Sequence, residues 1–92
     1  MDPQTTETFV RIRILEVLDQ FRGMPCREDS LADQLEMMLA AVRLTREQLA
    51  AQLEDLRKAG FIEYEIPKLG PTQWRITPQG KAEYHRYRYD QT

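Results

Sequence analysis

The chain has 92 residues, of which 41% are hydrophobic and 30% are charged, and its formal net charge at pH 7 is -2. This length supports one small domain with a single core and is too short for two. The longest apolar run, Met37 to Val42, is much shorter than the roughly 20 residues that cross a bilayer. The polar start has neither the basic nor the apolar region of a secretory signal. We therefore expect a cytoplasmic protein that does not act in a membrane.

The first predicted helix runs from Thr6 to Phe21 and ends before Gly23 and Pro25. Its apolar residues recur at the three- and four-residue steps of one helix face: Phe9, Ile12, Leu15 or Ile14, Leu18 and Phe21. Residues 1–5 are expected to form a flexible N-terminus, residues 6–89 one domain, and residues 90–92 a flexible C-terminus.

A second helix is predicted after a loop at residues 22–29. Ser30 followed three residues later by Asp33 resembles a capping box. The apolar face beyond it predicts a helix that extends to Ala41. Its outward charges are acidic, which disfavours close approach of this helix to DNA.

A third helix is predicted to begin at Arg46, directly after a turn at residues 42–44. Thr45 and Gln48 form a second capping box, and Gly60 ends the helix as a left-handed C-cap. Leu49, Leu53 and Leu56 form its core face. Two helices separated by so few residues predict a helix-turn-helix.

The remaining elements are a hairpin and a closing helix. Alternating residues at 62–66 and 73–77 predict two strands, joined by a tip at residues 67–71 that carries a proline at each end. Thr77 followed by Pro78 is the N-cap and N1 signature of a fourth helix, which extends to about Tyr89. The expected fold class is thus mainly α with a small two-stranded β-hairpin.

Two segments, LRKAGFIEYE and WRITPQGKAEY, resemble the corresponding parts of winged-helix regulators of the MarR, PadR and ArsR types. The residues that carry this resemblance are Leu56, Gly60, Phe61, Ile62, Trp74, Ile76, Thr77 and Gly80. The segments RIRILEVLDQFRGMPCREDSLADQLE and LTREQLAAQLEDLRKAGFI also resemble the small winged-helix proteins of Mu-like prophages. The resemblance implies a three-helix core, a two-stranded wing and a C-terminal helix.

In a winged helix, the third helix normally enters the major groove of double-stranded DNA, starting with its N-terminus. The residues expected to read bases or contact phosphate are Thr45, Arg46, Gln48, Ala51, Gln52, Lys68 and Arg75. Residues 66–92 carry a charge of +3, so we expect a positive wing and last helix on an acidic body. The leading hypothesis is therefore a small DNA-binding transcriptional regulator.

The third helix itself has no net charge, and phosphate neutralisation supplies much of the affinity of DNA-binding proteins. A homodimer would compensate for weak half-sites, and Tyr84 and Tyr87 are its candidate interface, although packing against the first helix is the simpler interpretation. The alternative hypothesis is a winged-helix adaptor that binds protein and not DNA.

Catalytic chemistry is the weakest hypothesis. The chain has one His, one Cys and no glycine-rich phosphate loop, and no nucleophile lies near a base in the sequence. Cys26 and His85 are too few groups for a metal site. We expect no enzyme activity, no cofactor and no metal, and we expect Cys26 to be a half-buried loop thiol.

Overall fold

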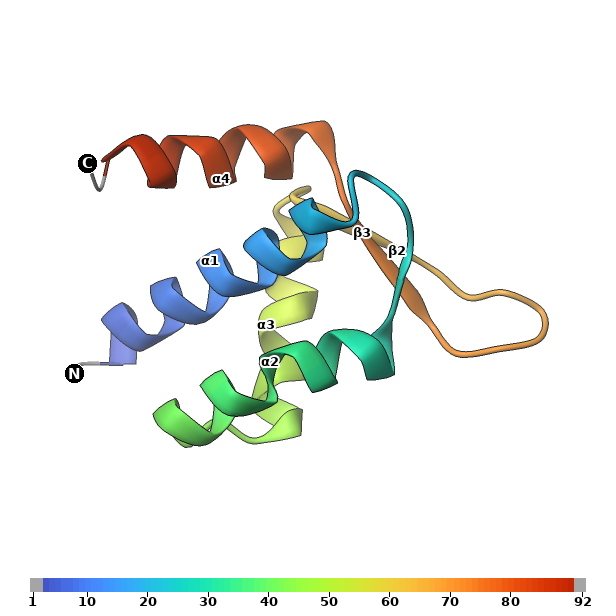
Figure 1. Ribbon diagram of the computed structural model, residues 1–92, viewed down its shortest axis with the longest axis horizontal. Helices are drawn as coiled ribbons and strands as arrows, with labels where there is room; N and C mark the ends of the chain where they lie inside the picture. The colour runs from blue at the N-terminus through green and yellow to red at the C-terminus, as the bar shows by residue number, and fades with distance from the viewer. Residues whose placement is uncertain (1–2, 91–92) are drawn as a thin grey trace.

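The chain folds into helices packed beside a small antiparallel sheet (Figure 1). The computed structural model describes residues 3–90, with side chains at 7–38 and 40–88. In chain order the elements are α1 (Pro3–Gln20), β1 (Cys26–Arg27), α2 (Glu28–Val42), α3 (Arg46–Lys58), β2 (Ile62–Glu65), β3 (Gln73–Ile76) and α4 (Pro78–Asp90). The predicted class, mainly helical with a small β-structure, is confirmed. Within residues 3–90 no helix is both long and apolar enough to cross a bilayer.

The sheet has three strands, in the order β1-β3-β2, and not the two that the sequence predicted. The β2–β3 hairpin pairs Ile62 with Ile76, and β1 adds a second antiparallel pairing, of Cys26 with Trp74. A two-residue strand is too short to show an alternating pattern, so residues 22–29 were predicted to be loop throughout. Strand β1 ties the start of α2 to the sheet.

This pairing also moves the start of α2 from the predicted Ser30 to Glu28. The Glu28 amide donates a hydrogen bond to the Thr72 carbonyl (2.9 Å), so the helix begins directly at the edge of the sheet. The predicted capping box at Ser30 is wrong, because the Ser30 amide donates to the Asp29 carboxylate instead (2.9 Å). The start of α2 is thereby fixed beside the hairpin.

Helix α3 begins and ends as predicted. Thr45 accepts a hydrogen bond from the Gln48 amide through Oγ1 (3.1 Å), and Gln48 accepts one from the Thr45 amide through Oε1 (2.8 Å). Gly60 has a φ of +85° just beyond the C-cap residue, Ala59. Thr77 is also the predicted N-cap of α4, since its Oγ1 accepts from the Gly80 amide (3.0 Å).

The outer helices are longer than predicted. Helix α1 begins at Pro3, because proline is tolerated in the first turn of a helix, and α4 extends to Asp90. Residues 3–5 and 90, predicted to be flexible ends, are therefore helical, whereas residues 1–2 and 91–92 lie outside the described residues.

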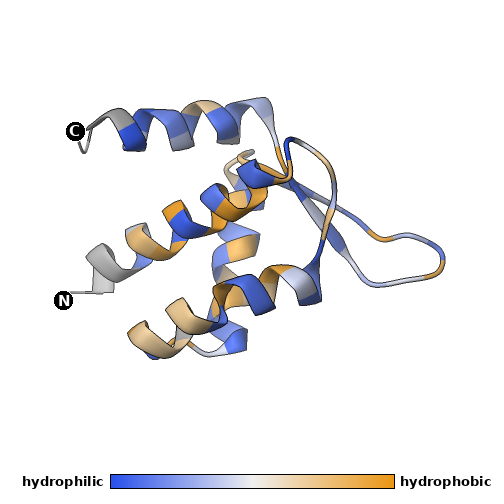
Figure 2. Ribbon diagram, viewed as in Figure 1, coloured by the Kyte–Doolittle hydropathy of each residue, from blue (hydrophilic) through white to orange (hydrophobic). Residues whose placement is uncertain are grey.

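One hydrophobic core joins the helices to the sheet. Hydrophobic residues follow α1 and α2 and recur on the hairpin, which projects beyond the helices (Figures 1 and 2). The buried core residues are Val10, Ile14, Leu15, Val17, Leu18, Cys26, Leu31, Ala32, Leu35, Met38, Leu49, Leu53, Leu56, Ile62, Trp74, Ile76 and Tyr84. The core holds α3 against α1 and leaves the start of α3 facing outward.

Candidate functional site

The start of α3 presents a small exposed surface. Thr45, Arg46, Gln48 and Ala51 are all exposed, as the sequence predicted. The capping box fixes the Gln48 side chain at the helix end, because its amide oxygen is bonded to the Thr45 backbone. Four of the predicted contact residues therefore lie on one accessible surface.

Gln52 does not belong to this surface. It is only 9% exposed, and its Oε1 accepts a hydrogen bond from Nε of Arg11 on α1 (2.8 Å). Arg11 also pairs with Asp55 one turn further along α3 (3.4 Å). The prediction that Gln52 is an outward residue of the third helix is wrong, because its side chain is buried and bonds α3 to α1.

The hairpin is not the positive wing that the charge distribution predicted. Lys68 is exposed at the tip, but Arg75 on β3 forms an ion pair with Glu63, its register partner on β2. Glu65 balances Lys68 in the net charge of the hairpin. The net charge of residues 66–92 suggested a positive wing because residue 66 divides the hairpin. The acidic strand of the hairpin lies before that residue and the basic strand after it.

The later turns of α3 are also neutralised. Arg57 donates hydrogen bonds to the Glu54 carboxylate, one of them from Nε at 2.9 Å. This hydrogen bond is the main reason that the pKa of Glu54 is lowered and the pKa of Arg57 is raised. The Arg57 guanidinium also lies 5.6 Å from the ring centroid of Tyr64 on β2. The Arg57 guanidinium is thus held by Glu54 and Tyr64 of the same chain and is not a free cation for a phosphate.

The hairpin carries an exposed apolar tip. Leu69 is 95% exposed and Ile66 is 68% exposed, while Tyr64, nearer the core, packs against Trp74 with their ring centroids 5.4 Å apart. Residues 67 and 71, which flank the tip, are both proline. The tip therefore offers apolar side chains and a single cation, Lys68.

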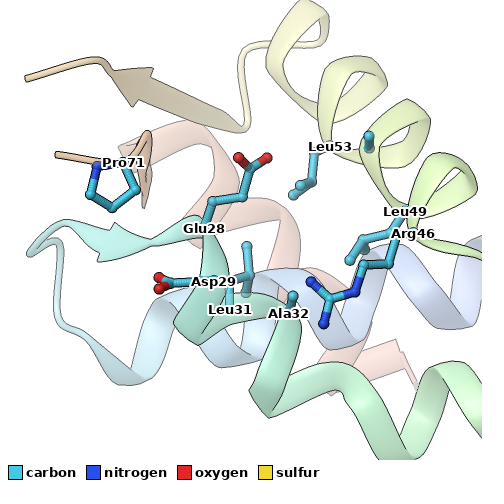
Figure 3. Close-up of a pocket in the computed structure, with 9 residues that line it drawn as sticks. Glu28, Asp29, Leu31, Ala32, Arg46, Leu49, Leu53 and Pro71 are labelled. Carbon is cyan, nitrogen blue, oxygen red and sulfur yellow. The ribbon is translucent and has the colours of Figure 1, made fainter.

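A groove of about 320 Å³ lies between the start of α2, the first half of α3 and the hairpin. Its floor consists of the apolar side chains Leu31, Ala32, Leu49 and Leu53. Pro71 lines it from the hairpin, as Figure 3 shows. The groove thus lies beside the exposed start of α3, with the hairpin at its other end.

Two residues of opposite charge line this groove. Glu28 points into it from α2, and Arg46 reaches across it from α3 toward Ala32 (Figure 3). The Asp29 carboxylate turns away and pairs with Arg27 (3.0 Å). Among the side chains of residues 7–38 and 40–88, neither Glu28 nor Arg46 has an ion-pair partner. Sequence reasoning missed this groove because its α2 wall depends on the unpredicted strand β1.

Tyr84, a candidate residue of the predicted dimer interface, lies inside the fold. This residue is only 8% exposed, and its hydroxyl donates to Oε2 of Glu16 on α1 (3.4 Å). Packing against the first helix, the simpler interpretation of the sequence, therefore describes Tyr84. Tyr87 is half-buried beside α1 residues, and its role in a dimer stays a prediction.

Comparisons of this chain with protein-family models, with curated proteins and with solved structures found no match. The resemblance to winged-helix proteins therefore stays a prediction from the residues that carry it. What the chain binds has to be inferred from its own surfaces.

Cys26 is a buried strand residue and not the half-buried loop thiol that the sequence predicted. Burial, and secondly the Asp29 carboxylate, raise the pKa of this thiol. The thiol's contribution to stability is fully present below the pKa of the unfolded thiol and declines as pH rises above it, since the unfolded chain then ionises first.

We expect thiol reagents to modify Cys26 slowly in the native protein at about pH 8 and rapidly after unfolding in urea. Mass spectrometry over time measures both rates, and Cys26→Ala gives the background, since Cys26 is the chain's single cysteine. Equal rates in the native and unfolded protein would contradict the burial of this thiol.

Proposed function

We propose that this chain is a winged-helix protein whose α2–α3–hairpin face binds another protein. This docking face comprises residues 26–32, 46–53 and 62–76. The observation that carries the proposal is the combination of an apolar groove and an apolar tip on a surface without excess positive charge. A groove with an apolar floor beside the exposed side chains of Ile66 and Leu69 supports an interaction with another protein.

The charges of the docking face argue against DNA as its partner. Its carboxylates are Glu28, Asp29, Glu47, Glu63 and Glu65, and its cations are Arg27, Arg46, Lys68 and Arg75. Two of the four cations, Arg27 and Arg75, are already in ion pairs. A surface that binds DNA needs cations to replace the counterions of the phosphates. This face offers few, and its carboxylates would repel phosphate.

Site-specific photo-cross-linking tests the proposal. A cross-linking amino acid is placed at Ala51 or Leu69, both exposed on the docking face, and at Lys81, exposed on α4, as the matched control. In the cells that make the protein, we expect the first two positions to give the same protein adduct and Lys81 to give none. Adducts with DNA, or the same adduct from all positions, would contradict the proposal.

DNA binding is the second candidate, because the exposed start of α3 follows α2 after only a short connector, as in a helix-turn-helix. In that case Arg46→Ala and Lys68→Ala should each weaken binding and reduce its salt dependence. An electrophoretic shift of DNA fragments at low salt separates the two candidates. We expect no shift at micromolar protein.

A further inference from the structure

We propose that the groove between α2, α3 and Pro71 takes a segment of the partner protein that carries an apolar side chain between a basic and an acidic residue. This inference rests on the proposed function and deepens it by naming the chemistry of the partner. Two features carry it: the floor of the groove and the two charged residues that line it.

The floor of the groove selects an apolar side chain. Leu31 of α2 and Leu49 and Leu53 of α3 form most of it. They offer no polar group, so a polar side chain placed there loses its hydrogen bonds to water without replacement. A volume of about 320 Å³ accommodates a large apolar side chain.

The walls of the groove select the flanking charges. Glu28 of α2 and Arg46 of α3 both line the groove, and they do not form an ion pair with each other. A bound segment therefore satisfies both when its basic residue lies beside Glu28 and its acidic residue beside Arg46. Complementary charges of this kind fix the direction and register of a partner more than its raw affinity.

Nucleic acid does not fit this arrangement as well. A phosphate beside Arg46 brings the rest of the backbone toward Glu28, which repels it. The experiment below distinguishes this partner segment from a second copy of the chain.

Selection from a displayed library of random peptides tests the inference, with wild type, Glu28→Lys and Arg46→Glu as immobilised baits. Wild type is expected to enrich peptides with an apolar residue between a basic and an acidic one. Peptides selected on Glu28→Lys should carry an acidic residue in place of the basic one. Peptides selected on Arg46→Glu should carry a basic residue in place of the acidic one. Each variant should bind the wild-type peptide at least about tenfold more weakly.

Asp33→Lys is the matched control, because it makes the same charge change on an exposed residue of α2 outside the groove. It should select the wild-type peptides. Circular dichroism establishes that each bait is folded before selection.

The outcomes distinguish the inference from the proposed function. If Glu28→Lys and Arg46→Glu enriched peptides with the same charge pattern as wild type, the inference would be overturned. It would also be overturned if the protein formed a dimer in gel filtration and the two groove variants dissociated that dimer. A protein adduct from Ala51 and Leu69 without any enriched peptide would overturn the inference and leave the proposed function intact. Failure of both experiments would overturn both.

Discussion

Replacing Gly80 by alanine is expected to destabilise the protein by about 3 kcal/mol, although the same change usually stabilises a helix by about 0.5–1 kcal/mol. The reversed sign comes from the close approach of α4 to the backbone before β2. A Cβ at Gly80 would lie 1.9 Å from the Phe61 carbonyl oxygen and 2.9 Å from Cγ1 of Ile76. A carbonyl oxygen cannot rotate aside as a flexible side chain does, so the helix itself has to move.

Movement of α4 would break a compact set of hydrogen bonds. The Thr77 amide donates to the Phe61 carbonyl (3.0 Å), and Thr77 Oγ1 donates to the Gly60 carbonyl (2.6 Å). The same hydroxyl caps α4 by accepting from the Gly80 amide. The steric clash therefore falls on the junction that joins the hairpin to both α3 and α4.

Urea unfolding followed by circular dichroism measures the change, with Lys81→Ala as the control for alanine on an exposed neighbouring position of α4. We expect the control to lie within about 0.5 kcal/mol of wild type. If Gly80→Ala were as stable as the control, α4 would not approach Phe61 as closely as described.

Local sequence signals predicted the elements well. Thr45 with Gln48, Gly60, and Thr77 with Pro78 each have a backbone role that depends only on near neighbours in the chain. Their hydrogen bonds and dihedral angles therefore agree with the prediction. The β2–β3 pairing was likewise visible, because its residues alternate on both strands.

The candidate site was less predictable, because it depends on contacts between distant residues. Gln52 lies three residues after Leu49, at the edge of the core face of α3, and a polar side chain can be buried there once Arg11 supplies a donor. Nothing local to either residue indicates the other. Phe9 is the opposite case: its apolar spacing on α1 predicts burial, and yet it is 42% exposed.

The site also depends on how charges pair across elements. The net charge of a segment does not show that Arg75 is held by Glu63 or that Arg27 holds Asp29. These pairs leave Glu28 and Arg46 as the charges that face the groove. Few unpaired cations are therefore left on this face, which is why the function that we propose differs from the leading hypothesis of the sequence.

Trp74→Ala is expected to destabilise the protein by about 3–5 kcal/mol, a large part of the stability of a domain this small. Trp74 is buried on the central strand β3, opposite Cys26 on β1 and Tyr64 on β2. Its removal leaves a cavity between the sheet and the helices. Because Trp74 packs opposite Cys26 on the strand that leads into α2, we also expect its removal to disorder the groove and to weaken the peptide binding proposed for it.

Trp74→Phe is expected to cost much less, about 1 kcal/mol. Phenylalanine keeps an aromatic ring beside Tyr64 and removes the indole N–H, which is buried without a hydrogen-bond partner among the described residues. A buried donor without a partner costs about 1–3 kcal/mol, so its removal offsets part of the lost packing. Because Trp74 is the chain's single tryptophan, unfolding has to be followed by circular dichroism and not by tryptophan fluorescence.

The difference between the two variants separates packing from hydrogen bonding at this position. If Trp74→Phe destabilised the protein as much as Trp74→Ala, the indole N–H would have to donate a hydrogen bond in solution, and the volume of the ring would not be the main contribution. If only Trp74→Ala lost stability and peptide binding together, the aromatic ring would be the element that holds β1, the hairpin and the start of α2 in one face. The docking face would then depend on the three-stranded sheet and not on α3 alone.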